Sequence, residues 1–257
     1  IRMLTLSVVI PTRNEALWLP RTLGALANSK LPSEIIVVDN YSEDATRVIA
    51  TTAGCSVLNG GLPAFARNFG MAASTGDIVL FLDADVVISA DAITEAAAAI
   101  SAGAGCVVFR HVPIGSRTAS VAFRFLHHAA EILALINIHV GIGSALMVRR
   151  DCFAAIGGFN EDLTAGEDID LILRISRIAK TTYQGNFPVY VSARRFRAEN
   201  PIGYLCKVLL WTVLRIARIP LDIIPYSWPR YTAGTRNKEI AIEPHRKSDR
   251  PRRTPDI

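Results

Sequence analysis

Cysteine is scarce in this sequence of 257 residues, and its few cysteines are not grouped. Cys55, Cys106, Cys152 and Cys206 lie far apart, and no C-x-x-C pair is present. Small domains that depend on disulfides carry dense cysteines. We therefore expect four reduced thiols that behave as small apolar side chains in a reducing compartment.

Three further patterns are missing. The longest uncharged stretch of the apolar C-terminal region, residues 208–214, is far below the ~20 residues that a membrane-spanning helix needs. Residues 1–10 alternate and then meet Pro11, which is not the pattern of a secretory signal. No G-x-G-x-x-G follows the first expected strand, which weighs against a dinucleotide-binding fold. We expect a cytoplasmic protein.

The formal net charge of +5 is unevenly distributed. Residues 1–193 hold 14 basic and 17 acidic side chains, whereas residues 194–257 hold 14 and 6. An acidic body with a basic end suggests two roles. The basic end suits anionic lipid or an acidic protein. We expect no nucleic-acid partner, because no recognised binding motif accompanies the charge.

Strand and helix patterns alternate from residue 4 to residue 101. Four apolar, β-branched runs predict strands at 4–10, 34–39, 55–58 and 78–82. Helices are expected between them, the second one capped by Ser42. This alternation predicts a parallel sheet with right-handed crossovers, and therefore an α/β domain, which we place at residues 1–200.

Two acids follow the central strand, in the stretch GDIVLFLDAD at 76–85. Ligands of open α/β sheets bind beyond the carboxyl ends of the strands. Asp83 and Asp85 would repel one another there, and a hard divalent cation with oxygen ligands would relieve that repulsion. The plainer alternative is a strand-end turn with solvated acids.

A second acidic cluster begins a helix at residues 166–174. Glu167, Asp168 and Asp170 lie in its first turn, where they complement the helix dipole. A functional alternative is a carboxylate held at a cleft edge to accept a proton. The sequence alone favours neither.

The histidines are expected to be structural. His127 and His128 are adjacent on an expected helix, so their side chains point about 100° apart and are poorly placed to share a metal. His111 and His139 are isolated, and His111, near a strand end, is the better placed of the two to face a cleft.

Four motifs in order, at residues 8–15, 35–46, 66–85 and 157–174, resemble the family 2 glycosyltransferases. The resemblance covers roughly residues 4–192. It implies the GT-A fold, in which one α/β domain has a nucleotide-binding half and an acceptor-binding half. It also implies transfer of a sugar from a nucleotide diphosphate donor, a UDP- or GDP-sugar, mostly with inversion.

The resemblance also implies roles for individual residues. Asp168 matches the catalytic base, and Glu167 is the less favoured holder of that role. Asp85 would bind Mg²⁺ or Mn²⁺, with Asp83 near the ribose and the metal. The remaining donor-binding positions are Pro11, Thr12, Asn14 and Glu15 in the nucleotide pocket, Asp39 at the base, and Arg67 near the base or diphosphate.

The Q-x-x-R-W motif of processive synthases is absent after residue 168, which favours transfer of one or a few sugars. The acceptor is expected to be a glycan or a lipid-linked molecule of the cell envelope. One alternative is a transferase that acts on polyprenyl phosphate. Another is a catalytically silent nucleotide-sugar-binding or scaffold protein, although both acid motifs are intact.

Residues 201–228 predict an amphipathic helix. Its polar stripe consists of Lys207, Trp211, Arg215, Arg218 and Asp222. The helix either packs on the domain or on a partner subunit in a homodimer, or lies through residues 201–225 on the inner face of the plasma membrane. Residues 229–257 predict a basic, disordered tail.

Overall fold

The computed structural model describes residues 4–29, 31–163, 165–194 and 201–217. Its first half is a parallel sheet in the order β3-β2-β1-β4. The strands are β1 (Leu6–Thr12), β2 (Pro32–Asp39), β3 (Ser56–Asn59) and β4 (Ile78–Leu82). The helices between them are α1 (Leu19–Ala27), α2 (Thr46–Thr52) and α3 (Pro63–Ala73). All four predicted strands of this half are confirmed.

The second half makes the sheet mixed, with eight strands among the described residues in the order β3-β2-β1-β4-β7-β6-β8-β5. Strand β7 runs antiparallel to both of its neighbours, β4 and β6. The added strands are β5 (Val86–Val87), β6 (Ala104–Ile114), β7 (Ala145–Arg149) and β8 (Lys180–Ser192). The added helices are α4 (Ala90–Ser101), α5 (Arg117–Leu135), α6 (Arg150–Ala155), α7 (Glu167–Ile175) and α9 (Pro201–Ile216).

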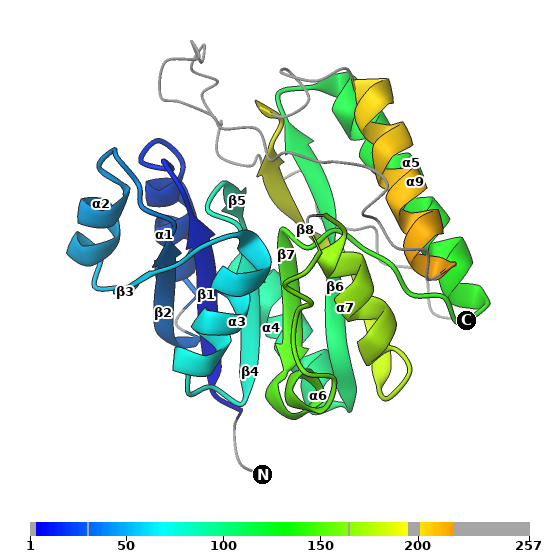
Figure 1. The fold of residues 1–257 in the computed structure, drawn as a ribbon, viewed down its shortest axis with the longest axis horizontal. Coiled ribbons are helices and arrows are strands. Elements are labelled where there is room, and N and C mark those ends of the chain that lie inside the picture. Colours follow the sequence, from blue (N-terminus) through cyan, green and yellow to red (C-terminus); the bar gives the residue numbers. More distant parts are fainter. Residues whose placement is uncertain (1–3, 30, 164, 195–200, 218–257) are drawn as a thin grey trace, which may run out of the picture.

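The α/β class is confirmed, and helices lie on both faces of the sheet (Figure 1). A hydrophobic core lies between the sheet and the helices on each face. Alternate residues of a strand point to opposite faces. In β1, Val8 and Ile10 therefore pack with α1 and α4, while Val9 packs with α3 and α7. Every residue of β4 is buried. This doubly covered sheet is a rigid base for the side chains at its carboxyl edge.

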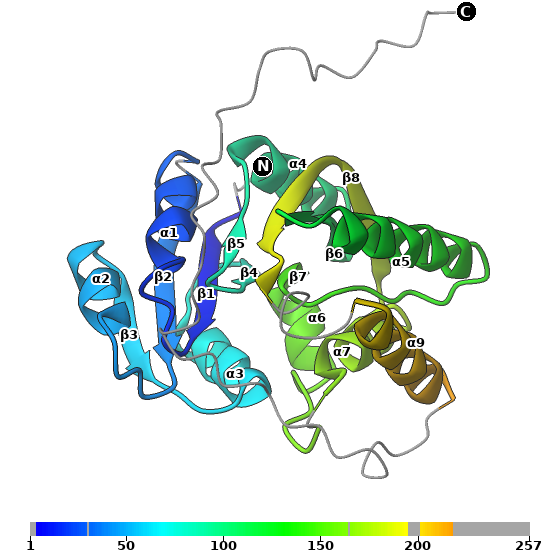
Figure 2. The same cartoon turned by 90° about the horizontal axis from the view of Figure 1, so that it is seen from above.

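Helix α9 lies beside α5 and also contacts α7 (Figure 2). Trp211 is buried against Ala165 and Leu214, whereas Leu210 and Val213 are exposed. The expectation that Trp211 belongs to a solvent-facing stripe is therefore wrong. Arg218, Asp222 and the tail at 229–257 lie outside the described residues.

The helices in the described part of the chain include none that is both long and apolar enough to cross a membrane.

Candidate active site

The loops after β1 and β2 are joined by hydrogen bonds at the carboxyl edge of the sheet. Thr12 Oγ1 donates to Asp39 Oδ1 at 3.2 Å, and the Asn14 amide donates to Ser42 Oγ at 2.8 Å. In return, Asn14 Oδ1 accepts from the Glu43 amide at 2.8 Å. Asn14 has a φ of 55°, in the left-handed region that asparagine tolerates best among residues with a side chain. Pro11 is half-buried near the end of β1, and the loop that follows is held in place by these hydrogen bonds.

Asp39 is fully buried, and its carboxylate organises the second loop. Its Oδ2 accepts from the Ser42 amide at 3.0 Å and from Arg47 Nη1 at 3.2 Å. Ser42 also donates through its hydroxyl to Asp39, so it does not cap α2 as expected. The N-cap of α2 is Ala45, which makes no side-chain capping bond. Binding of a nucleotide base by Asp39 stays a prediction.

Arg67 of α3 connects the two acid motifs. Its Nη2 donates to Asp83 Oδ1 and its Nη1 donates to Glu167 Oε1, both at 2.9 Å. The side chain is buried, and its guanidinium lies 5.5 Å from the centre of the Phe159 ring. Burial lowers the pKa of Arg67, but Asp83 and Glu167 outweigh it and the net shift is upward. The arginine is therefore a permanent cation between the two halves of the domain.

Asp168 has a separate set of partners. Its Oδ2 accepts from the Gly143 amide at 2.6 Å, and its Oδ1 accepts from the Ile169 amide at 2.8 Å. Burial raises the pKa of Asp168, while Arg67 and these amides oppose that shift. Glu167, by contrast, is held by Arg67, which leaves Asp168 as the better candidate for proton transfer. The third acid, Asp170, forms an ion pair with Arg174 within α7.

Gly143 lies so close to Asp168 that no larger residue fits without movement. A Cβ atom on Gly143 would lie 2.4 Å from Asp168 Cβ. The sequence shows the glycine-rich loop, but not this approach between residues 25 positions apart. The loop before β7 is therefore part of the site.

Arg194 lies between Glu15 and Asp85, and the sequence-based prediction missed it. Its Nη1 donates to Glu15 Oε2 at 2.7 Å, its Nη2 donates to Glu15 Oε1, and its Nε lies 3.1 Å from Asp85 Oδ2. Burial raises the pKa of Glu15 to about 7, with Arg194 opposing that shift. Strand β5 pairs with β8 at Val86 and Val191, which brings Arg194 to Asp85. The only feature of the sequence that could have pointed to Arg194 is that acids held close together need a cation.

The predicted residues thus form separate clusters: Thr12 with Asp39, Glu15 with Asp85 through Arg194, and Asp83 with Glu167 through Arg67. Within the described ranges, no group of three or more His, Cys, Asp or Glu side chains could hold a metal ion. Carboxylate oxygens such as those of Asp83 and Asp85 are ligands that Mg²⁺ and Mn²⁺ prefer. Binding of a metal ion by these two acids stays a prediction, and each of them is paired with an arginine.

The close approach of Gly143 predicts a specific sensitivity to one methyl group. Gly143→Ala should lower the free energy of unfolding by about 1–3 kcal/mol, because overpacking forces the loop away from Asp168. Gly185→Ala is the control, since Gly185 is exposed and a Cβ there meets nothing within 4 Å. It should change stability by less than about 1 kcal/mol. Urea unfolding measures both, and equal effects would contradict the packing described here.

The sequence of residues 7–157, more than half of the chain, matches the model of glycosyl transferase family 2. The 4,4'-diaponeurosporenoate glycosyltransferase of Staphylococcus haemolyticus is 34% identical over 36% of this chain and 27% of that protein. The pre-mycofactocin glycosyltransferase of Mycobacterium tuberculosis is 29% identical over 66% of this chain and 38% of that protein. The chain thus spans well under half the length of these relatives.

The fold is also similar to solved structures. The mannosyltransferase PcManGT of Pyrobaculum calidifontis, solved with GDP-Man and Mn²⁺, has 18% identity, covers 89% of this chain and 66% of its own, and gives a TM-score of 0.66. The likeness shows the fold, and it confirms the expected GT-A architecture. By its sequence and fold, this chain belongs to glycosyl transferase family 2.

Proposed function

We propose that this chain transfers a sugar from a UDP- or GDP-sugar to an acceptor hydroxyl, with inversion and without processive elongation. The observation that carries the proposal is the Arg67 bridge. It fixes Asp83, on the donor side, and Glu167, next to the candidate base Asp168, around one buried guanidinium. Donor and acceptor groups would meet between these two acid motifs.

Asp168 would act as the general base. A sugar hydroxyl is a poor nucleophile, and its proton would pass to Asp168 while its oxygen bonds to the anomeric carbon. The bond from that carbon to the diphosphate oxygen breaks in the same displacement, so the nucleoside diphosphate leaves with the bonding electrons. One displacement inverts the anomeric configuration. General-base help of this kind contributes roughly 10²–10⁴-fold.

Positive charge would stabilise the departing diphosphate. Arg67 supplies one fixed cation close to Asp83. We include Mg²⁺ or Mn²⁺ in the proposal, held by Asp85 with Asp83. Such an ion supplies Lewis-acid stabilisation of the leaving diphosphate when bound. Arg194 contacts Asp85 and would have to share this carboxylate with the ion.

The two alternatives are less well supported. A phosphate nucleophile, as in a polyprenyl-phosphate transferase, needs no strong base, yet Asp168 is held by two amides beside the site. A silent binding protein is expected to have a damaged acid motif, and both motifs here are intact and linked through Arg67. We therefore favour hydroxyl transfer.

Peripheral contact with the inner face of a membrane also belongs to the proposal. Helices α5 and α9 lie side by side and expose apolar side chains, namely Val121, Phe125, Ile132, Leu135, Leu210 and Val213. Amphipathic helices of this kind bind membrane interfaces through their apolar face. We therefore extend the proposed contact from residues 201–225 to include the exposed apolar side chains of α5.

Replacement of Asp168 tests the base. Asp168→Asn should leave donor affinity nearly unchanged and lower kcat by about 10²-fold or more, because its amide cannot accept the proton. Since burial raises the pKa of Asp168, the wild-type kcat should fall as the pH drops through that raised pKa. Steady-state kinetics and donor calorimetry measure these effects. An active Asp168→Asn beside an inactive Glu167→Gln would assign the base to Glu167.

Calorimetry with and without Mn²⁺ tests the metal. Asp85→Asn should remove the Mn²⁺-dependent part of UDP- or GDP-sugar binding, because the ion and the diphosphate bind together. Asp91→Asn, an exposed acid in the first turn of α4, is the control and should bind as the wild type does. Equal donor affinity of the wild type in Mn²⁺ and in chelator would remove the metal from the mechanism.

Liposome sedimentation tests the membrane contact. The full chain should bind anionic vesicles, more weakly at high salt because the charge attraction is screened. Phe125→Glu with Leu210→Glu should release it without lowering the melting temperature, since both side chains are exposed. Val48→Glu, at a still more exposed apolar position on α2, is the control. Failure of the wild type to bind would exclude this surface.

A further inference from the structure

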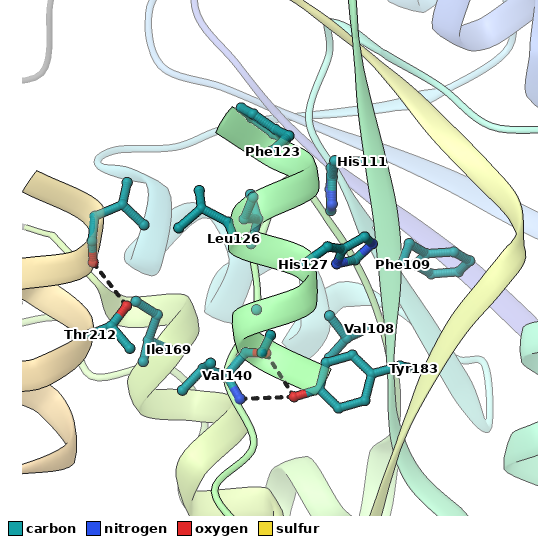
Figure 3. A pocket seen from close by; sticks show the side chains of 14 residues that line it. Val108, Phe109, His111, Phe123, Leu126, His127, Val140, Ile169, Tyr183 and Thr212 are labelled. Carbon is teal, nitrogen blue, oxygen red and sulfur yellow. Dashed lines mark hydrogen bonds between the residues drawn. The ribbon is translucent and has the colours of Figure 1, made fainter. Parts of the chain in front are cut away.

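A mostly apolar pocket lies under α5 and α9, on the acceptor side of the domain (Figure 3). The empty space along its walls, with the adjoining open solvent included, is about 470 Å³. Its walls come from five elements and one loop: β6, α5, the loop before β7, α7, β8 and α9. Residues distant in sequence therefore enclose one space.

The polar atoms of this pocket are mostly used by the protein itself. The Tyr183 hydroxyl accepts from the Val140 amide at 3.0 Å and donates to the Val140 carbonyl at 2.8 Å. Thr212 Oγ1 donates to the Val208 carbonyl of its own helix at 2.8 Å. What these groups leave to a ligand is chiefly the apolar surface of side chains such as Phe123 and Leu126.

His111 is a buried polar residue of this wall. It is 4% exposed, lines the pocket, and its Nε2 atom has no hydrogen-bond partner among the residues that the structure describes. Burial lowers the pKa of His111 to about 3, with His127 adding to that effect, so the ring is neutral at neutral pH. A buried polar atom without a partner costs free energy that a ligand could recover. A hydroxyl or carbonyl of a bound molecule would supply the missing bond.

The pocket shares a wall with the candidate base. Gly141 and Ile142 line it, and the next residue, Gly143, donates to Asp168. Ile169, which directly follows Asp168 in α7, also lines it. Two segments of the pocket wall therefore continue directly into the base or into the glycine that donates to it. Donor-side residues such as Asp39 and Asp85 do not line it.

We propose that this pocket binds the apolar part of the acceptor, a single hydrocarbon chain whose polar end lies at Asp168. The inference rests on the proposed function, because it names the class of acceptor for that base. The exposed apolar side chains of α5 and α9 support it, since the helices that carry them also form the outer wall. A lipid acceptor would reach the pocket from the surface that these helices present.

The test uses the full chain and the fluorescent probe N-dodecyl dansylamide. The wild type should bind the probe with increased emission, and dodecyl glucoside, but not glucose, should displace it. Leu126→Trp fills the pocket and should weaken probe binding at least tenfold. Phe125→Trp, the neighbouring exposed position on the same helix, should bind within twofold of the wild type. Thr212→Phe obstructs the space from the opposite wall and should act like Leu126→Trp.

Two results would contradict the hydrocarbon site. One is a wild type that does not bind the probe, and the other is wild-type affinity for the probe in both Leu126→Trp and Thr212→Phe. If both variants melt early, a photoreactive dodecyl ketone on the wild type decides, and labelled peptides outside α5, β6 and α9 would contradict the inference. Donor calorimetry runs in parallel. A wild type that binds the probe but no sugar-nucleotide donor would refute the proposed function. A wild type that binds the donor but not the probe would refute only the hydrocarbon site.

Discussion

The geometry of the site depends on one buried cation, Arg67. A buried guanidinium is costly to desolvate unless carboxylates and further hydrogen bonds compensate it. Asp83 and Glu167 provide that compensation from β4 and α7, so the end of the central strand and the start of the acceptor-side helix have one relative position. Without the arginine, the buried Glu167 and the half-buried Asp83 would lose their compensating cation. The ion pairs of Arg67, a residue of α3, thus set the position of Asp83 relative to Glu167.

Arg194 repeats this arrangement at the outer end of the site. It joins the loop after β1 to the turn after β4, and of its two acids Asp85 is buried and Glu15 is half-buried. The carboxyl edge of the sheet therefore holds two arginines that pair with four acids, which leaves an excess of negative charge when all four acids are ionised. A divalent cation that enters with a diphosphate would balance the charge of the diphosphate. The acceptor side differs, since Asp168 is held by neutral amides.

The sequence was sufficient to predict what depends on local patterns. The strands of the first half are apolar runs between polar loops, and both acid motifs stand at the element ends where they were expected. Arg194 was not predictable, because its position depends on the pairing of β8 with β5 and β8 has no clear alternation. The approach of Gly143 to Asp168 and the inward turn of Trp211 likewise depend on packing between distant segments. Local periodicity carries no information about such contacts.

The most direct test of the account is a crystal structure with a non-hydrolysable UDP- or GDP-sugar and Mn²⁺. We expect the nucleotide base beside Asp39 and the diphosphate at Asp83 and Asp85. The anomeric carbon of the sugar should face Asp168 across the Arg67 bridge. A donor bound with its anomeric carbon turned away from Asp168, or bound outside this edge of the sheet, would contradict it.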